Sequence, residues 1–268
     1  MSAKLFTIII LCCCSIQLLA QPHVGVWELE KILVKDSKGK VVEEDIFINR
    51  ARQVKVLTPT HFMFIAEKID SLDNTKSYFR RSVAGRYQIQ DGKYHEYFDY
   101  STRKEDKLGQ KSDDMAIKLE AGKLIQIGDA GKDEKGVRYT WEEVYQKIDL
   151  PAQDHTTVGA WEEQTDTYRA MRIITPTHLF EIATSKDGKE IKGVVGATYI
   201  KKGDDFIHTF IYGLDKSRNQ TSVAKRKMEG DRLITSGRIK DASGKDIGQF
   251  TRTFTRVGSK TVKTASTK

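Results

Sequence analysis

Short stretches of alternating apolar and polar residues cover most of the chain, and the turns between them are rich in glycine and aspartate. The segments 94–100 (YHEYFDY) and 206–212 (FIHTFIY) are dense in aromatic and β-branched residues, which favours strands. The stretches QDGK, KGDD, EAGK and EGDR supply the residues that hairpin turns need at positive φ. No 12-residue window carries an apolar period of 3.6 residues. The pattern predicts an all-β chain of antiparallel strands.

The same motifs occur twice, in the same order. Gly25–Trp27 (GVW) returns as Gly159–Trp161 (GAW), and TPTHFMFI at 58–65 returns as TPTHLFEI at 175–182. The two aromatic segments and the later stretches KLEAGKL and KMEGDRL match as well, at offsets that shrink along the chain as loops shorten. Because order and local spacing are both kept, we interpret the chain as a tandem duplication.

The duplication sets the expected domain boundaries. We predict a signal peptide over 1–20, a first barrel over 21–148, a linker over 149–158, a second barrel over 159–257 and a disordered basic tail over 258–268. A meander of about eight to ten strands has exposed edges, and closing it into a barrel removes them. The predicted fold is therefore two tandem antiparallel up-and-down β-barrels. The second is the smaller, because its stretch between the tryptophan and the T-P-T-H motif is shorter.

The N-terminus indicates export. A charged start at Lys4, an apolar run over 5–19 and a small residue at Ala20 predict a cleavable signal peptide, and so a secreted or periplasmic protein. The alternative is a lipoprotein acylated at one of the cysteines at 12–14, although the residues before them lack a small side chain. These are the chain's three cysteines, so the mature protein has no disulfide. No later apolar stretch reaches 18 residues, and we expect no transmembrane span in the mature chain.

The charge does not indicate a nucleic-acid partner. The 45 lysines and arginines exceed the 37 acids, but bases and acids are interleaved in nearly every segment. Only the short tail GSKTVKTASTK is purely basic. Scattered charge of this kind is typical of a solvated strand face. We expect a monomer that does not bind nucleic acid.

The two copies together indicate which strand face is buried, because side chains alternate between the faces of a strand. After the T-P-T turn, the histidine shares its face with apolar residues in both copies. The opposite face carries Glu181 in the second copy. We therefore expect that opposite face to meet water and the histidine face to line the barrel.

The same comparison on the aromatic segments predicts inward side chains that carry one ionisable group in each copy, Glu96 or His208. We expect His61 beside Glu96 in the first barrel and His178 beside His208 in the second. The predicted ligand-binding side chains are His61, Met63, Tyr94, Glu96 and Phe98 in the first barrel, and His178, Phe180, Phe206, His208 and Phe210 in the second.

An ionisable group inside an apolar barrel needs a partner. In one interpretation the histidines are polar anchors in a ligand pocket; in the other they make internal hydrogen bonds that hold the T-P-T turn. Two imidazoles also suit a metal, but zinc needs three or four ligands and no third is evident. A His–Glu pair suits acid–base catalysis, but no nucleophile with a recognisable signature accompanies it. We assign no catalytic residue, no metal site and no cofactor.

A Gly-x-Trp opening the first strand, hairpins throughout and a basic residue in the closing strand resemble the lipocalin, or calycin, superfamily. The stretches TPTHFMF, DGKYHEY and KLEAGKL look like a lipocalin-like domain of secreted bacterial proteins of uncharacterised function. The resemblance implies that the tryptophan plugs the closed end of the barrel under a basic residue, here Trp27 under Lys147 and Trp161 under Arg256.

This resemblance favours a protein that binds a small hydrophobic or amphipathic molecule inside one or both barrels. The alternative is a non-enzymatic structural or interaction module whose barrels are filled by their own side chains, since barrels of about eight strands occur in both forms. A third hypothesis is an enzyme, or a barrel that binds haem or a metal.

Overall fold

The structure is a computed structural model that describes residues 21–44, 51–70, 72, 76–214 and 219–258. Every regular element in these ranges is a β-strand. None of the residues described belongs to a helix long and apolar enough to cross a membrane. The expected signal peptide, and all of the expected tail after residue 258, lie outside the described residues.

The strands of the described residues fall into two groups that follow the duplication, nine in the first and eight in the second. The first group is β1 (Gly25–Asp36), β2 (Val41–Glu44), β3 (Ala51–Leu57), β4 (His61–Ile69), β5 (Ser77–Gln90), β6 (Lys93–Ser101), β7 (Met115–Glu120), β8 (Lys123–Lys132) and β9 (Arg138–Lys147). The second group is β10 (Gly159–Gln164), β11 (Tyr168–Ile174), β12 (His178–Ser185), β13 (Ile191–Lys202), β14 (Asp205–Gly213), β15 (Thr221–Glu229), β16 (Arg232–Lys240) and β17 (Asp246–Arg256).

The first group forms a ring-like sheet, barrel 1, in which each strand pairs with its neighbours in an antiparallel manner. The long strand β1 makes this closure possible. Its first residues pair with β3, its last residues pair with β2, and β9 runs along nearly all of it. The strand β2 is therefore an addition at the end of β1, built from the longer stretch between the tryptophan and the T-P-T-H motif in the first copy.

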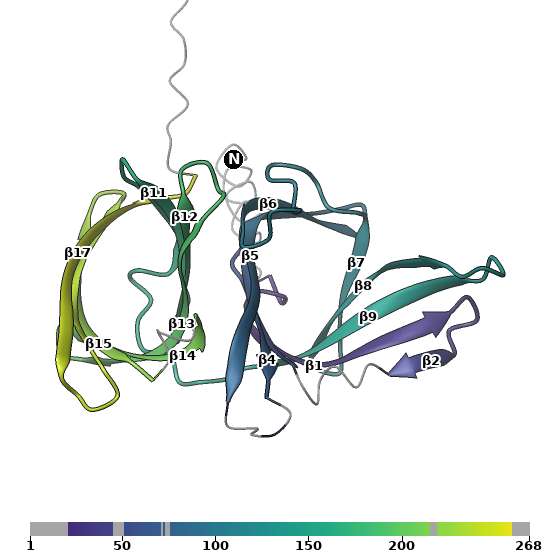
Figure 1. Ribbon diagram of the computed structural model, residues 1–268, viewed down its shortest axis with the longest axis horizontal. Coiled ribbons are helices and arrows are strands. Elements are labelled where there is room, and N and C mark those ends of the chain that lie inside the picture. The colour runs from purple at the N-terminus through teal and green to yellow at the C-terminus, as the bar shows by residue number, and fades with distance from the viewer. Residues whose placement is uncertain (1–20, 45–50, 71, 73–75, 215–218, 259–268) are drawn as a thin grey trace, which may run out of the picture.

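The second group is a closed eight-stranded barrel, barrel 2, which closes between β10 and β17. Figure 1 shows the two rings side by side, with the ends of β1, β2, β8 and β9 projecting away from barrel 2. The predicted all-β fold with two tandem antiparallel barrels is confirmed. The shorter first hairpin of the second copy does not prevent closure of its barrel.

The hairpin turns follow the local sequence. In the stretch QDGK between β5 and β6, Asp91 and Gly92 both have positive φ, at 53° and 73°. Two consecutive residues of this kind make a type I′ turn, whose twist matches that of the flanking strands. Aspartate and glycine tolerate this conformation, so the turn and the strand register that it sets can be traced to two residues.

The barrels pack against each other through one apolar cluster, here called the seam cluster. Its buried members come from both copies and lie mostly at equivalent positions: Val26, Val54, Val56, Met63, Ile65, Ala84 and Tyr100 from barrel 1, and Ala160, Met171, Ile173, Phe180, Ile182, Val194 and Tyr212 from barrel 2. The exceptions are Ala84, whose counterpart is Gly196, and Val194, whose counterpart is Ser82. Across this cluster β4 contacts β14, and β12 contacts β5 and β6. The cluster therefore buries the outer faces of β4 and β12, each against strands of the other barrel.

A β-bulge in each copy brings one aromatic ring into the seam cluster. The register shifts between Ala84 and Gly85 of β5 opposite β6, and between Gly196 and Ala197 of β13 opposite β14. Each bulge turns the last aromatic residue of the following strand, Tyr100 or Tyr212, out of the alternation that its neighbours follow. These two rings then face the other barrel.

Polar contacts fix the relative orientation of the two barrels. The Arg52 guanidinium lies 4.2 Å from the centroid of the Tyr212 ring, and its Nη2 donates to the Tyr212 hydroxyl at 3.0 Å. The backbone N–H of Gly213 donates to Oε1 of Glu67 at 2.9 Å, and this carboxylate is fully buried. Directional contacts added to an apolar cluster select one docking geometry, so we expect the two barrels to behave as one rigid unit.

The seam cluster predicts a large effect for Phe180→Ala. The ring is fully buried and stacks on Tyr212 with 6.3 Å between centroids. Removing it leaves a cavity between the barrels, and we expect the free energy of unfolding to fall by about 3–5 kcal/mol in urea denaturation. Ile200→Ala, at a site that is 45% exposed on the same barrel, is the matched control. We expect it to change stability by less than about 0.5 kcal/mol.

Candidate functional site

In each copy the tryptophan of the Gly-x-Trp motif, here called the plug, is buried beside a basic residue of the closing strand. Trp27 and Trp161 are buried, and each indole N–H donates to the carbonyl four residues earlier, at 2.9 Å in both copies. Lys147 Nζ lies 5.7 Å from the Trp27 ring centroid, and the Arg256 guanidinium lies 4.4 Å from the Trp161 ring. Each basic residue is also the register partner of its tryptophan. The plug thus has the same geometry in both copies.

The glycine of the motif is needed by the basic side chain that crosses it. Gly25 and Gly159 have φ of 154° and 143°, a region that side chains rarely adopt. A Cβ atom at Gly159 would lie 2.9 Å from Arg256 Nη1, and one at Gly25 would lie 3.2 Å from Lys147 Cε. Glycine therefore lets the side chain of the lysine or arginine cross the first residue of the strand and reach the indole.

The interior of barrel 1 contains a cavity of about 520 Å³. Its walls include the rings of Phe64, Phe98 and Trp141. Its polar lining includes Lys55 and Glu96, which lie deep in the barrel. A cavity of this volume, with aromatic walls and a few polar groups at fixed positions, is typical of small-molecule sites.

The polar floor of this cavity is a buried hydrogen-bond network. Lys55 Nζ donates to Glu96 Oε1 at 3.0 Å and to Gln126 Oε1 at 2.5 Å, and the Tyr94 hydroxyl donates to the same Glu96 oxygen at 2.8 Å. Burial, with a further contribution from Glu96, raises the pKa of Tyr94 well above its ordinary value, so the phenol stays a neutral donor. The buried lysine and glutamate are thus paired, as burial of charge requires.

The cavity is bordered by the loop at 102–114, where β6 and β7 separate. These strands pair at only two positions, Lys93 with Ala116 and Tyr94 with Met115. The loop covers the remaining edge of β6 and contributes Arg103 and the segment 112–114 to the cavity lining. Side chains of both signs therefore meet at this edge.

Barrel 2 has a different interior, with about 190 Å³ of free space. Arg172 donates to Glu181 Oε2 through Nε at 2.8 Å and Nη2 at 2.6 Å, and Arg252 joins Glu181 to Glu163. Burial alone would raise the pKa of Glu181, but the two guanidinium groups outweigh it and lower the pKa below its ordinary value. This ion network fills the space that is open in barrel 1.

His208 also lies inside barrel 2 and is neutral. Its Nε2 accepts from Arg226 Nη2 at 2.9 Å, so its Nδ1 carries the proton and donates to Ser222 Oγ at 3.0 Å. Burial, with the charges of Arg226 and Arg172, lowers its pKa to about 3. The imidazole is a fixed hydrogen-bond link between two strands.

The prediction that the T-P-T-H histidines face the barrel interiors was wrong. His61 shares its strand face with Met63 and Ile65, and His178 shares its face with Phe180 and Ile182, all of which belong to the seam cluster. The imidazoles lie between the barrels, and each Nδ1 is within 2.8 Å of the hydroxyl of the preceding threonine. His61, Met63, His178 and Phe180 are thus outside the barrel cavities.

The cause of this error is the assignment of Glu181 to solvent. The carboxylate is on the inner face and is neutralised there by two arginines, while the apolar histidine face is buried by the other barrel. The expected pairs are wrong for the same reason. Glu96 pairs with Lys55 in place of His61, and His208 and His178 lie on opposite faces of the barrel 2 wall.

The remaining predicted side chains lie inside the barrels. Tyr94, Glu96 and Phe98 contact the interior of barrel 1, and Phe206, His208 and Phe210 that of barrel 2. Within the described ranges, no group of three or more His, Cys, Asp or Glu side chains could hold a metal ion.

Sequence reasoning missed two inward cations, Lys55 and Arg172. Each stands three residues before the first threonine of its T-P-T motif, in KVLTPTH and RIITPTH. Each is buried and pairs with a glutamate inside its own barrel. A basic residue that recurs at the same place in both copies was the signal that could have revealed them.

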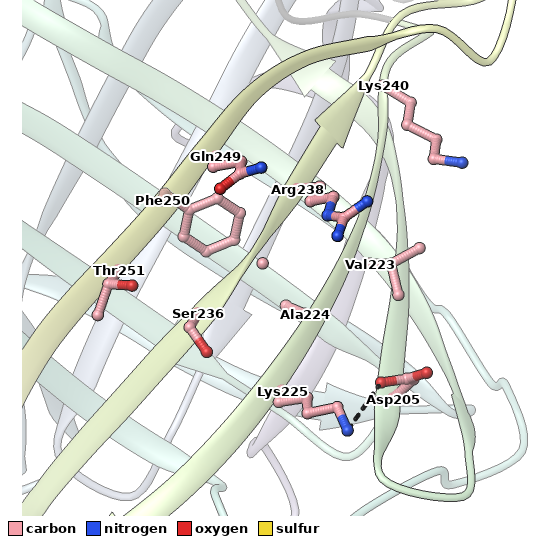
Figure 2. A pocket seen from close by; sticks show the side chains of 11 residues that line it. Asp205, Val223, Ala224, Lys225, Ser236, Arg238, Lys240, Gln249, Phe250 and Thr251 are labelled. Carbon is pink, nitrogen blue, oxygen red and sulfur yellow. Dashed lines mark ion pairs between the residues drawn. The ribbon is translucent and has the colours of Figure 1, made fainter.

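A further hollow of about 740 Å³ lies on the outer surface of barrel 2, over β15, β16 and β17. Figure 2 shows its charged side chains, Asp205 of β14, Lys225 of β15, and Arg238 and Lys240 of β16, with the ion pair between Lys225 and Asp205 at 4.0 Å. Arg238 pairs with Asp246 at 3.5 Å. Exposed pairs of this kind contribute little binding energy, and the hollow is a weak candidate beside the barrel 1 cavity.

The buried His178 predicts a loss of stability in acid. Burial lowers its pKa to about 4, below the 6.5 of the unfolded chain, so the unfolded state binds the proton more tightly. This contribution is complete above pH 6.5 and is lost as pH falls towards 4. Between pH 7 and pH 5 this histidine should lower the free energy of unfolding of the wild type by about 2 kcal/mol. We expect His178→Gln to lose less stability than the wild type over this range, by that amount, as measured by urea denaturation. An unchanged difference between the two pH values would contradict the assignment.

The ion network of barrel 2 predicts that Glu181→Gln is strongly destabilising. The substitution leaves Arg172 buried without its carboxylate, and we expect the free energy of unfolding to fall by about 3–5 kcal/mol. Glu190→Gln removes an exposed partner of Lys192 on the same barrel and serves as the control. Thermal unfolding of both variants at neutral pH measures the effect, and equal midpoints would rule out a structural role for the network.

No family model matches the chain, and no curated protein matches it. Among solved structures, the chain is similar to the uncharacterised protein YLR301w of Saccharomyces cerevisiae, with 12% identity and a TM-score of 0.51, over 87% of this chain and 98% of that one. It also aligns with a protein of unknown function from the DUF3598 family of Nostoc punctiforme, with 10% identity and a TM-score of 0.26, over 88% and 97% of the two chains. The similarity to the yeast protein shows a shared fold.

Proposed function

We propose that this protein is an exported, lipocalin-like binding protein that holds a small amphipathic molecule inside barrel 1. The observation that carries the proposal is the cavity of about 520 Å³ in barrel 1, with aromatic walls and a buried polar floor. Its volume is within the range of small-molecule pockets, which begins at about 300 Å³.

The lining supports a ligand with one apolar and one polar part. The rings of Phe64, Phe98 and Trp141 offer apolar surface, whose burial contributes about 25 cal/mol per Å². Lys55 and Gln126 offer polar atoms that are already held in place by Glu96 and the strands. A preorganised polar floor orients a bound molecule at little entropic cost.

Barrel 2 acts in this proposal as a structural partner. Its ion network occupies the interior, and the seam cluster supports the strands β4 and β5 that form one wall of barrel 1. The filled interior of barrel 2 also favours the second candidate function, a non-enzymatic interaction module. The two candidates differ in whether the barrel 1 cavity takes up a ligand.

Export is part of the proposal, and it rests on the sequence of residues 1–20. A protein exported into an oxidising compartment commonly carries disulfides, but the three cysteines of this chain all lie at 12–14. The position of each tryptophan under a basic residue supports the lipocalin-like assignment. Both repeats within the chain have the geometry that the resemblance implies.

A cavity-filling substitution tests the proposed site. Ala66 lines the barrel 1 cavity, and Ala66→Phe should fill part of it. We expect the fluorescent probe N-phenyl-1-naphthylamine to bind the wild-type protein, and to bind Ala66→Phe at least tenfold more weakly. Ala116→Phe places the same side chain at an exposed position of β7 and should bind the probe as the wild type does.

Native mass spectrometry of the protein purified from its own host provides the second measurement. A small-molecule adduct that is present in the wild type and in Ala116→Phe, and lost in Ala66→Phe, would support the proposal. Equal probe binding by all three proteins, or no binding by the wild type, would refute it and leave the interaction module.

A further inference from the structure

A second hollow, of about 580 Å³, lies between the two barrels at their plugged ends. It is here called the seam pocket, and it is separate from both barrel interiors. Each copy contributes the same three parts: the glycine that opens the first strand, the T-P-T turn and the basic residue of the closing strand. The linker adds Leu150 and Ala152. The duplicated motifs that opened the sequence comparison thus converge on one site.

The turns are held rigidly around this pocket. In both copies the first T-P-T threonine accepts the backbone N–H of the histidine through its hydroxyl, at 2.9 Å. Its carbonyl accepts a tyrosine hydroxyl, from Tyr87 at 2.5 Å and from Tyr199 at 2.7 Å. The proline fixes φ at the centre of each turn. The pocket is therefore formed before any ligand arrives.

The charge of the seam pocket has one sign. Among the described residues, Lys147 and Arg256 are the ionisable ones that line it, and no described carboxylate does so. Lys147 is exposed and, within the described part of the chain, its ammonium makes no ion pair or hydrogen bond and contacts only the Trp27 ring. Most other lining side chains are apolar, and Leu150 is 42% exposed. The barrel 1 cavity differs, because acids such as Glu96 and Glu143 line it together with bases.

We propose that the seam pocket binds an amphipathic anion, an alkyl or aryl chain that carries a carboxylate, sulfate or phosphate group. The apolar chain lies between the two T-P-T turns and against Leu150, where it covers apolar surface. The anionic group contacts Lys147, because a charge-assisted hydrogen bond to its exposed ammonium meets no competing carboxylate among the described residues that line the pocket. This site is independent of the barrel 1 cavity.

Titration with dodecanoate below its micelle concentration tests this proposal by isothermal calorimetry, with dodecanol as the uncharged probe. Lys147→Met removes the charge and keeps the length of the side chain. We expect this variant to bind dodecanoate at least tenfold more weakly than the wild type and to bind dodecanol with the same affinity. Ala152→Trp, which places a ring in the pocket, should abolish the binding of both probes.

Two further variants locate the binding. Ala66→Phe blocks the barrel 1 cavity and should leave dodecanoate affinity unchanged, so a failure of the proposed barrel 1 function does not affect this test. In Trp141→Phe the remaining tryptophans are Trp27 and Trp161, directly under the two basic residues. Their fluorescence should change when dodecanoate binds.

Several results would overturn the proposal. Equal affinity of Lys147→Met and the wild type for dodecanoate would exclude the anionic contact. Loss of dodecanoate binding in Ala66→Phe would assign the ligand to barrel 1. A concentration-dependent dimer in sedimentation velocity, abolished by Ala152→Trp, would show that a second copy of the chain covers the pocket.

Discussion

Burial of both faces of the strand that follows each T-P-T turn is the constraint on which the rest of the structure depends. In β4 the residues 61–65 are all buried, with Phe62 and Phe64 facing the barrel interior and Met63 and Ile65 facing the seam cluster. The equivalent strand β12 is buried in the same way. A strand with two apolar faces can fold only if something covers each face, so neither barrel reaches its observed burial without the other.

The two copies solve the same electrostatic problem in different ways. A cation stands at the same position on the inner face of each barrel, Lys55 or Arg172. The compact ammonium of Lys55 is satisfied by one oxygen of Glu96 and one of Gln126. This arrangement leaves the rest of the barrel 1 cavity open. The larger planar guanidinium brings in a second arginine and a second glutamate, and their side chains fill the barrel. One open and one filled barrel follow from this difference.

Much of the fold could be predicted from the sequence because its signals are local. Turn chemistry, strand composition and the order of repeated motifs depend on neighbouring residues, and they identified an antiparallel β chain in two copies. The inward position of Tyr94, Glu96 and Phe98 followed from alternation along a single strand. The position of His61 and His178 could not be predicted in this way. Alternation divides a strand into two faces, but it does not show which face lies in the barrel interior and which packs against the other barrel. Glu181 was misassigned because the two arginines that neutralise it, Arg172 and Arg252, stand on other strands, β11 and β17.

The seam cluster has a consequence for the architecture as a whole. Equivalent residues of the two copies meet face to face, so the contact is isologous, and it is saturated once two copies have docked. A third copy added to the chain would find the seam face of each barrel already covered. The duplication therefore yields a closed pair with an approximate twofold relation, in contrast to repeat proteins, whose head-to-tail contacts allow the array to grow.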